Sequence, residues 1–422
     1  MRTALVLGGS GFIGRHVVAA LEGAGWRVVR VVRPRGGEPE GVCAVDLAHA
    51  TGASQWEARL AGVDAVVNCA GLLRERGADR FETLHVKMPQ ALAEACRARG
   101  IRRFVQISAL GHPDDGEFIA SKHRGDRVVL DQLPEALVLR PSVICGLSGS
   151  YGGTSLLRAL AALPGGLVLP GHGQWRMQPM LVEDLAQLVV AGLAGEVRGV
   201  HEVGGPQAMT LHQYLAHWRH WLELPTGGVL HVPEIVVDVA ARCGEWLGRG
   251  PLGLAVWRMM KRGNVLAAPL DEAAFGFQVR AIDEALAARP SHVQDRWHAR
   301  LYLLGPLLSA MLVLLWLISA WVGFVTPAAV IERMAAGGPT AEWPLVAMAR
   351  GAGALDLIVG LWLASGWRPR HALLVMGAMV LAYTFVFGLF QPGQWFDPLG
   401  GLAKNLVVLP AIAIAWVLVD RR

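Results

Sequence analysis

Residues 1–32 read MRTALVLGGSGFIGRHVVAALEGAGWRVVRVV and decide the fold of the first part of the chain. The apolar run Ala4–Leu7 leads into the glycine-rich turn Gly8–Gly14. The helical run Arg15–Gly25 follows, and the β-branched run Arg27–Val32 comes after it. Strand, turn, helix and strand within about 30 residues make one βαβ unit with a phosphate-binding turn. The order of these pieces predicts a nucleotide-binding site.

Glycines stand at positions 8, 11 and 14 of this turn. They allow a tight bend, a close approach of the backbone to a pyrophosphate and close packing of the helix on the strand. The N–H groups of Gly11, Phe12 and Ile13 open the helix, where unpaired donors and the helix dipole favour an anion. A tight turn without a ligand would show similar glycines, but the flanking strand and helix favour nucleotide binding.

The composition indicates that one part of the chain lies in water and another part in a membrane. Hydrophobic residues make up 53% of the 422 residues and charged residues only 17%, which is apolar for a soluble protein. Only twelve of the 39 Lys and Arg and 34 Asp and Glu residues lie beyond residue 300. The net charge of +5 is modest and no basic tract with interleaved aromatic residues is present, so we expect no nucleic-acid partner.

Cysteine usage and the N-terminal sequence indicate a reduced compartment. Five cysteines, none in a CxxC pair, predict neither a metal site nor a disulfide framework. The apolar run after Arg2 ends at Gly8 and is too short for a signal peptide. We therefore expect the first domain to stay in the cytoplasm.

Arg33 follows the second predicted strand, where an NAD-binding site usually carries an Asp or Glu for the ribose 2′-hydroxyl. A guanidinium binds a 2′-phosphate by paired hydrogen bonds. The position therefore favours NADP(H) over NAD(H), with Arg15 or Arg35 as helpers. The alternative is a solvated charge at a strand end.

Strand and helix patterns continue to alternate, which predicts an α/β fold with a doubly wound parallel sheet. Asp46 and Leu47 follow the third strand and fall near an adenine, and the small residues Asn68–Gly71 let a cofactor lie against the end of the fourth. Ser108 ends the fifth strand. The predicted pieces are strands at Val42–Val45, Ala65–Val67 and Arg103–Ile107 and a helix at Arg80–Arg99.

Several separate pieces, matched in order over about residues 1–265, resemble an extended or atypical short-chain dehydrogenase/reductase of the Rossmann type. The nearest group is the one related to the NADPH-binding accessory subunit of respiratory complex I. The matching pieces are Gly8–Gly14, Asp46–Leu47, Asn68–Gly71, Ser108, Lys122, Leu139–Gly146, Gln178–Ala186 and Glu202–Pro206.

The resemblance implies a Ser and a Tyr-x-x-x-Lys pair, in which the lysine lowers the pKa of the tyrosine and holds the nicotinamide ribose. Here the segment reads Phe118-Ile119-Ala120-Ser121-Lys122, so the lysine is present and the phenol is absent. Phenylalanine has no exchangeable proton, and standard turnover is not expected through position 118. Candidate substitutes are Tyr151, Ser108, Ser121, His112 and His123.

The resemblance also implies the site residues. Lys122 and Ser108 are the expected catalytic positions, and no metal is expected. The expected cofactor-binding residues are Gly8, Ser10, Gly11, Phe12, Ile13, Gly14, Arg33, Asp46, Leu47, Cys69, Ala70, Gly71, Ser108, Lys122, Pro141 and Val143.

Residues 146–290 are expected to form a smaller substrate-side lobe and to complete a first domain of residues 1–290. Amphipathic helices are predicted at Ile235–Leu247 and Leu254–Arg262, and they carry basic and aromatic residues, Trp246 and Trp257 among them. Such helices indicate either a membrane-surface contact or a lid with solvated charges.

Residues 301–422 contain four apolar runs, which predict an all-α bundle that crosses a membrane. Spanning a bilayer needs roughly 20 residues. The runs are Leu303–Val325, Leu345–Gly366, Ala372–Phe390 and Leu402–Val419.

Loop charges give the expected orientation. Basic residues precede the first run, the second turn contains Arg368 and Arg370, and the chain ends with Arg421 and Arg422. The other two loops, which carry Glu332, Arg333 and Glu342 in one and Asp397 and Lys404 in the other, have little net positive charge. The positive-inside rule then puts the nucleotide-binding domain and the C-terminus in the cytoplasm, beside a multi-pass span of the inner membrane.

This last quarter resembles the DoxX-like family, on span count, length and the segment from Arg350 to Asp356. Ionisable groups within a span are costly and usually face the bundle interior or water. Arg350, Asp356 and Lys404 therefore form either a polar site for a quinone head group or a proton path, or a buried structural pair with a snorkelling lysine.

The sequence thus predicts a membrane-anchored NADP(H)-binding protein with a sensing or respiratory-chain-associated role. Its expected partners are the lipid bilayer, a quinone or another hydrophobic small molecule, and a protein of a respiratory complex. The alternatives are an active NADPH-dependent reductase or epimerase on a quinone- or lipid-like substrate, and a non-enzymatic assembly or scaffold factor.

Overall fold

The structure is a computed structural model that describes residues 1–34, 41–75, 77–246, 253–335, 344–396 and 401–419. It divides into two compact units, Met1–Ala299 and Arg300–Arg422, and each is treated by itself below. Arg35, Glu342, Asp397, Arg421 and Arg422, which entered the predictions above, lie outside the described residues.

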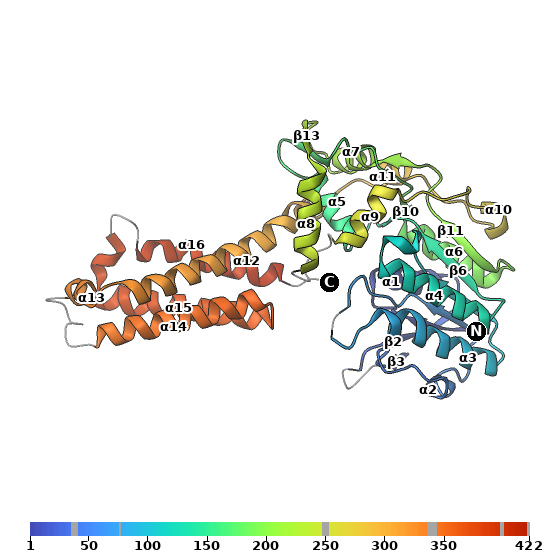
Figure 1. Ribbon diagram of the computed structural model, residues 1–422, viewed down its shortest axis with the longest axis horizontal. Coiled ribbons are helices and arrows are strands. Elements are labelled where there is room, and N and C mark those ends of the chain that lie inside the picture. The colour runs from blue at the N-terminus through green and yellow to red at the C-terminus, as the bar shows by residue number, and fades with distance from the viewer. Residues whose placement is uncertain (35–40, 76, 247–252, 336–343, 397–400, 420–422) are drawn as a thin grey trace. The chain divides into compact units, whose positions relative to one another are not determined.

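The first unit is built on a seven-stranded parallel sheet (Figure 1). The strand order is β11-β6-β5-β4-β1-β2-β3, so the winding direction reverses between β1 and β4. Leu7 pairs with Asn68 there, and the carboxyl ends of both strands meet at one edge. Ligands of doubly wound sheets bind at such a reversal. The strands are β1 (Thr3–Leu7), β2 (Arg27–Val32), β3 (Val42–Ala44), β4 (Ala65–Asn68), β5 (Arg103–Ile107), β6 (Leu137–Pro141) and β11 (Gly199–Val203).

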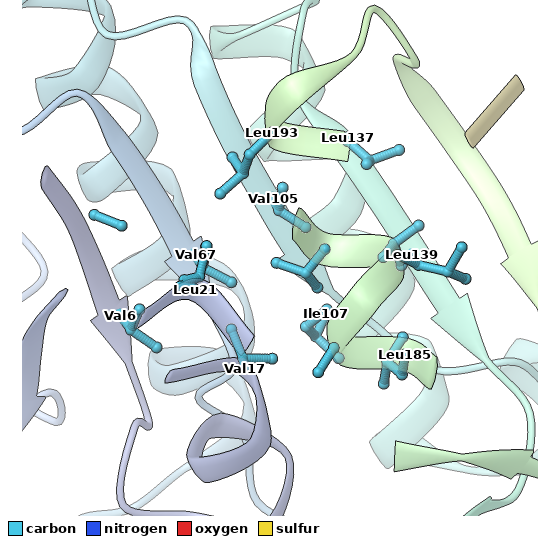
Figure 2. Packing of buried hydrophobic residues seen from close by; sticks show 14 of the residues in the cluster. Val6, Val17, Leu21, Val67, Val105, Ile107, Leu137, Leu139, Leu185 and Leu193 are labelled. Atoms are coloured by element: carbon cyan, nitrogen blue, oxygen red, sulfur yellow. The ribbon is translucent and has the colours of Figure 1, made fainter. Parts of the chain in front are cut away.

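Helices cover both faces of this sheet, because its strands are apolar on both sides. On one face Val6, Val17 and Leu185 belong to one apolar cluster, part of which Figure 2 shows. On the other face Leu5 packs with Leu92. The helices of this part are α1 (Phe12–Gly23), α2 (Ser54–Glu57), α3 (Met88–Ala98), α4 (Glu117–Gln132) and α6 (Val182–Ala194), with the π-helix η1 (Glu82–Lys87) and the 3₁₀-helix η2 (Pro113–Asp115). The sheet and the helices on both of its faces confirm the predicted α/β fold.

A smaller lobe follows β6 and has its own apolar core, which includes Leu157, Tyr214 and Trp218. Its helices are α5 (Gly153–Ala161), α7 (Leu211–Trp221), α8 (Glu234–Trp246), α9 (Leu254–Arg262) and α11 (Ile282–Ala287). The short helix α10 (Glu272–Phe275) instead packs on the core of the large sheet through Phe275. Its strands pair as β7 (Ile144–Cys145) with β10 (Met180–Leu181), β8 (Gly166–Pro170) with β13 (Gly228–Val232), and β9 (Arg176–Met177) with β12 (Met209–Thr210).

The second unit is helical. Three helices in the described residues are long and apolar enough to cross a membrane: α12 (Val293–Val325), α14 (Leu345–Ser365) and α15 (Pro369–Phe390). They match the first three predicted runs. The fourth run forms the 3₁₀-helix η4 (Leu402–Lys404) and the shorter apolar helix α16 (Asn405–Leu418), so four crossings remain a prediction. The other elements are α13 (Ala328–Ala335) and the 3₁₀-helix η3 (Pro392–Phe396).

Candidate functional site: a dinucleotide cradle

The glycine-rich turn joins β1 to α1 at the edge where the strand order reverses. Gly8 adopts a positive φ of 69°, and a Cβ atom on it would lie 2.9 Å from the backbone of Cys69 at the end of β4. A Cβ atom on Gly14 would stand 2.1 Å from the carbonyl oxygen of Gly8. Two of the three glycines are therefore required by close backbone contacts rather than by the bend alone.

The N-terminus of α1 offers backbone N–H groups to a ligand, but the Gly11 N–H, which was predicted to be unpaired, donates to the Gly8 carbonyl oxygen at 2.8 Å. Gly11 is its N-cap residue, no side chain caps it, and its first turn contains no acidic residue. Unpaired N–H groups and the helix dipole at such an end attract a phosphate. These residues therefore fit the pyrophosphate of a dinucleotide.

Lys122 lies buried at the same edge of the sheet, 6% exposed. Its ammonium group donates to the carbonyl oxygens of Ala70, at 3.3 Å, and Ile107, at 3.1 Å. Burial lowers the pKa of Lys122 to about 8, although the nearby Asp126 carboxylate opposes that shift. A Cβ atom on Gly71 would be 2.9 Å from its Nζ atom, so the small residue at 71 makes room for the lysine.

His85 is a buried part of this edge that the sequence did not single out. Its Nε2 atom accepts from the backbone N–H of Leu72 at 3.1 Å, so Nδ1 carries the proton and donates to Ser121 Oγ at 2.8 Å. Ser121 Oγ donates in turn to the Phe118 carbonyl oxygen at 3.0 Å. Burial, then the charges of Lys122 and Arg124, lower the pKa of His85 to about 2, so the ring is neutral. The network ties the loop after β4 to α4.

Ser108 is held by a buried carboxylate. Its hydroxyl donates to Asp126 Oδ2 at 2.8 Å, and Arg140 Nε donates to the same oxygen at 2.9 Å. Asp126 is fully buried, and its Oδ1 atom has no hydrogen-bond partner among the described residues. The proton of the Ser108 hydroxyl is thus directed at Asp126 and is not available to a ligand in this arrangement.

Phe118 occupies the motif position one helical turn before Lys122. Its ring centroid lies 5.9 Å from that of His85 and 6.3 Å from that of Phe81. The surroundings of the missing phenol are therefore aromatic. Both ring nitrogens of His85 are already hydrogen-bonded, one to Leu72 and the other to Ser121.

Tyr151 is the tyrosine of the loop before α5, and it reaches the glycine-rich turn. Its ring stacks on Phe12, with centroids 6.2 Å apart and an interplanar angle of 20°. The side chain is 55% exposed. A Cβ atom on the next residue, Gly152, would be 3.5 Å from Leu73 of the loop after β4. The loop thus contacts both sides of the edge where a dinucleotide would lie.

Arg33 lies at the end of β2, as predicted, and forms an ion pair of 2.5 Å with Asp79. It lines a hollow of about 360 Å³ together with Pro34, Asp46, Ala48, Ala78 and Asp79. The hydrogen bond from His49 lowers the pKa of Asp46. The partner of Arg33 is 46 residues away in the chain, and nothing in the local sequence indicated it.

The other predicted positions lie around the same edge. Ala70 and Gly71 follow β4 and frame Lys122. Burial raises the pKa of Cys69 to about 12, so it remains a neutral thiol. Pro141 ends β6, and Val143 follows it with its carbonyl oxygen accepting from Met180 N at 2.9 Å. Leu47 follows Asp46 beyond β3, and Ser10 lies exposed in the turn.

The polar groups of the second unit do not form one site. Arg350 donates to the carbonyl oxygens of Gly323, Phe324 and Thr326, at the C-terminal end of α12. Asp356 is 5% exposed and accepts from Ser319 Oγ at 2.5 Å. Lys404 is exposed. Arg350 and Asp356 are therefore held by separate partners on α12, and they are not paired with each other in the described structure.

The uncapped helix N-terminus, the buried lysine and the parallel sheet together define a dinucleotide-binding Rossmann domain. Residues 4–203 match the NAD dependent epimerase/dehydratase family, whose fold binds a nicotinamide cofactor. Residues 313–414 match the DoxX-like family. The chain therefore joins an epimerase and short-chain dehydrogenase-type domain to a DoxX-like domain with apolar helices.

Comparisons with individual proteins agree with this division. Ceramide reductase of Caulobacter vibrioides is 34% identical over 209 residues, which are 47% of this chain and 63% of that protein. The mitochondrial NADH dehydrogenase [ubiquinone] 1 alpha subcomplex subunit 9 of Arabidopsis thaliana is 26% identical over 245 residues, 53% of this chain and 60% of that protein. The chain thus spans less than two thirds of these relatives.

The first unit also resembles solved structures. UDP-glucose 4-epimerase of Thermotoga maritima aligns with a TM-score of 0.51 and 16% identity, over 67% of this chain and 96% of that protein. At this identity the likeness supports the fold alone. The predicted resemblance to the short-chain dehydrogenase and complex I subunit group is confirmed.

Proposed function

We propose that this chain is a membrane-anchored NADP(H)-binding protein of the short-chain dehydrogenase type that holds the nucleotide for a sensing or respiratory-chain-associated role. The observation that carries the proposal is Phe118, which stands one turn before the buried Lys122 among aromatic rings. The cradle at Gly8–Gly14 and the ammonium of Lys122 can hold a dinucleotide, whereas a phenyl ring cannot transfer a proton.

The preference for NADP(H) rests on Arg33. No acidic residue directly follows β2, and Arg33 lines the hollow that also contains Asp46 and Asp79. A 2′-phosphate offers the guanidinium a stronger partner than the Asp79 carboxylate does, because it is dianionic or nearly so and presents three acceptor oxygens. When bound, the nucleotide supplies a hydride at its nicotinamide ring.

The membrane side of the proposal rests on the three apolar helices and on the charge of the loops. We place the nucleotide-binding domain on the cytoplasmic side of the inner membrane, with four crossings and a cytoplasmic C-terminus. A quinone or another hydrophobic molecule and a respiratory-complex protein are the partners we propose. The similarity to a subunit of mitochondrial NADH dehydrogenase supports the second.

The test uses the full chain purified in detergent. Binding of NADPH and NADH is measured by calorimetry, and oxidation of bound NADPH is followed by its absorbance with quinones and ketones added. NADPH binding that exceeds NADH binding, without oxidation, supports the proposal. Failure to bind either nucleotide overturns it and favours an assembly or scaffold role.

A second candidate is an NADPH-dependent reductase of a lipid-like ketone, and two observations favour it. One is the 34% identity to a ceramide reductase. The other is Tyr151, whose phenol lies beside the glycine-rich turn through its stack on Phe12. In this reading bound NADPH would supply the hydride for the carbonyl carbon, Tyr151 would give its proton to the carbonyl oxygen, and solvent would reprotonate the exposed phenolate. The products are the alcohol and NADP⁺.

Substitutions at Tyr151 separate the two candidates. With NADPH and a long-chain ketone, Tyr151→Phe keeps the ring stack and removes the proton. Oxidation that the wild type supports and Tyr151→Phe loses, with unchanged NADPH affinity, favours the reductase. Equal oxidation by both forms removes Tyr151 as the donor.

A further inference from the structure

Helix α8 presents apolar side chains to solvent along one side. Ile235 is 70% exposed, Val236 52% and Val239 54%. Ala240 and Cys243 are exposed as well. Residues spaced by three or four positions share a helix face, and such spacings link these five side chains into one stripe, called here the outer face of α8. A surface helix of a soluble domain ordinarily turns such a stripe toward the core.

Polar contacts on the opposite side fix this orientation. Asp238 accepts from Trp257 Nε1 at 2.5 Å and from Lys261 Nζ at 3.2 Å, both on α9. The carbonyl oxygen of Gly244 accepts from Arg74 at 3.0 Å, and Ala241 is fully buried. Rotating α8 to hide the outer face would break these contacts. The exposed stripe is therefore a property of the folded lobe.

The preceding strand extends the apolar surface along the chain. β13 is separated from α8 by one residue, Pro233, and its Leu230 is 63% exposed and Val229 40% exposed. Large apolar side chains exposed in consecutive elements mark an interaction surface more often than scattered single residues do.

We propose that the outer face of α8 lies in the headgroup region of the bilayer as an interfacial helix. Two facts select lipid as the occupant. The first unit continues after Ala299 into a unit with helices of spanning length, so the chain that carries α8 is tethered to a membrane. Arg242 on α8 itself is exposed, and it suits a lipid phosphate beside the apolar stripe.

This contact gives α8 a role that does not depend on turnover. Arg74, which binds the Gly244 carbonyl oxygen, belongs to the loop after β4 that also carries Leu72 and Leu73. The docked helix would thus fix the loop at the cofactor edge with respect to the lipid. A hydrophobic ligand would then reach that edge from the membrane rather than from water.

Cys243 provides the test, because it is an exposed cysteine on the outer face. Cys96 and Cys145 are buried, and burial raises the pKa of Cys43 and Cys69, which makes these thiols poor nucleophiles. The full chain is labelled at Cys243 with an environment-sensitive fluorophore and reconstituted in lipid nanodiscs that contain nitroxide-bearing lipids. We expect a blue-shifted emission that these lipids quench at least several-fold more than they quench a label at an exposed site on α3, in a Cys243→Ser, Glu94→Cys chain.

A second variant guards against misreading the result. Ile235→Asp with Val239→Asp, labelled at Cys243, should lose most of the quenching while its thermal midpoint stays within a few degrees. A label at Cys243 that the nitroxide lipids do not quench overturns the proposal, and so does a blue shift without quenching, because that would mean cover by protein. NADPH binding is measured on the same samples, so failure of the nucleotide proposal is recorded separately.

Discussion

Gly14 lies so close to Gly8 that a Cβ atom at position 14 would stand 2.1 Å from the Gly8 carbonyl oxygen. We therefore expect Gly14→Ala to push α1 away from the turn and to destabilise the first unit by about 1–3 kcal/mol, with loss of nucleotide binding. Urea unfolding and NADPH titration measure both effects. Gly23→Ala, in the same helix with nothing near its Cβ position, should instead be neutral or stabilising by up to about 1 kcal/mol. Equal effects of the two changes would contradict the close contact.

Arg33 and Asp79 should affect NADPH binding in opposite directions. Removing the guanidinium with Arg33→Ala should weaken NADPH binding about 10- to 100-fold and leave NADH binding nearly unchanged, since a hydrogen bond to a charged group contributes about 1.5–3 kcal/mol. Asp79→Asn frees the guanidinium from an exposed ion pair and should strengthen NADPH binding by up to about fivefold. Calorimetric titration of both cofactors decides. Parallel losses for NADPH and NADH in Arg33→Ala would assign Arg33 a structural role.

Lys122 should give the first unit an unusual dependence on alkaline pH. Burial lowers its pKa from 10.5 to about 8, so between these values the unfolded chain binds the proton and the folded chain does not. Stability therefore rises as the pH rises from about 8 to about 10.5, relative to a chain without the group. Unfolding curves of the wild type and Lys122→Met, compared across this range, measure the difference. A difference that does not change with pH would mean that the lysine is not desolvated.

NADPH binding should show the opposite trend. The charged ammonium is the donor that can hold ribose hydroxyls, and it is lost as the pH passes about 8. We expect the affinity of the wild type for NADPH to fall above that pH and the affinity of Lys122→Met to be low and flat.

Restoring the phenol tests whether the rest of the site is intact. Phe118→Tyr should introduce slow NADPH oxidation with a ketone, because the new hydroxyl stands one helical turn from Lys122. Phe81→Tyr adds a hydroxyl to the neighbouring ring of the same aromatic group and serves as the control. If Phe118→Tyr stays inactive while it binds NADPH, the substrate lobe lacks what a reaction needs.

Arg350 should stabilise the second unit through the end of α12. Its guanidinium donates to three carbonyl oxygens that have no partner within the helix. Arg350→Met should destabilise the unit by about 1–3 kcal/mol, seen as a lower thermal midpoint in detergent. Lys404→Met, at an exposed position, is the control and should have little effect. Equal midpoints for the two variants would show that water or detergent satisfies those carbonyl groups.

The fold could be predicted because its signals are local. The first βαβ unit and β4 and β5 were recognised from short apolar runs, and the glycine spacing located the cradle. The contacts that define the site join residues far apart in the sequence, and the spacing of residues along the chain does not predict such contacts. Asp126 accepts hydrogen bonds from Ser108, which follows β5, and from Arg140 of β6. Asp79 pairs with Arg33, which lies 46 residues away in the chain.

The role of His85 was missed for a related reason. The apolar spacing of residues 80–99 predicts one regular helix, and the structure contains the π-helix η1 followed by α3. Apolar spacing reports which side of a helix is buried, and it does not report a single widened turn. The buried histidine was therefore indistinguishable from an ordinary helix residue.

The widened turn of η1 sets the direction in which the His85 imidazole points. The contacts of this edge therefore depend on the number of residues in the turn as well as on the histidine itself. A π-turn holds one residue more than an α-turn, and each residue rotates a helix by about 100°. Deleting a single residue between Glu82 and His85 would restore a regular helix and turn the imidazole away from Leu72 and Ser121. A Cβ atom on Gly125 would lie only 1.9 Å from the His85 carbonyl oxygen. Helix α4 can therefore pack against the widened turn of η1 only because position 125 is a glycine. The contacts of His85 thus constrain the number of residues in η1 as strictly as they constrain which residues stand there.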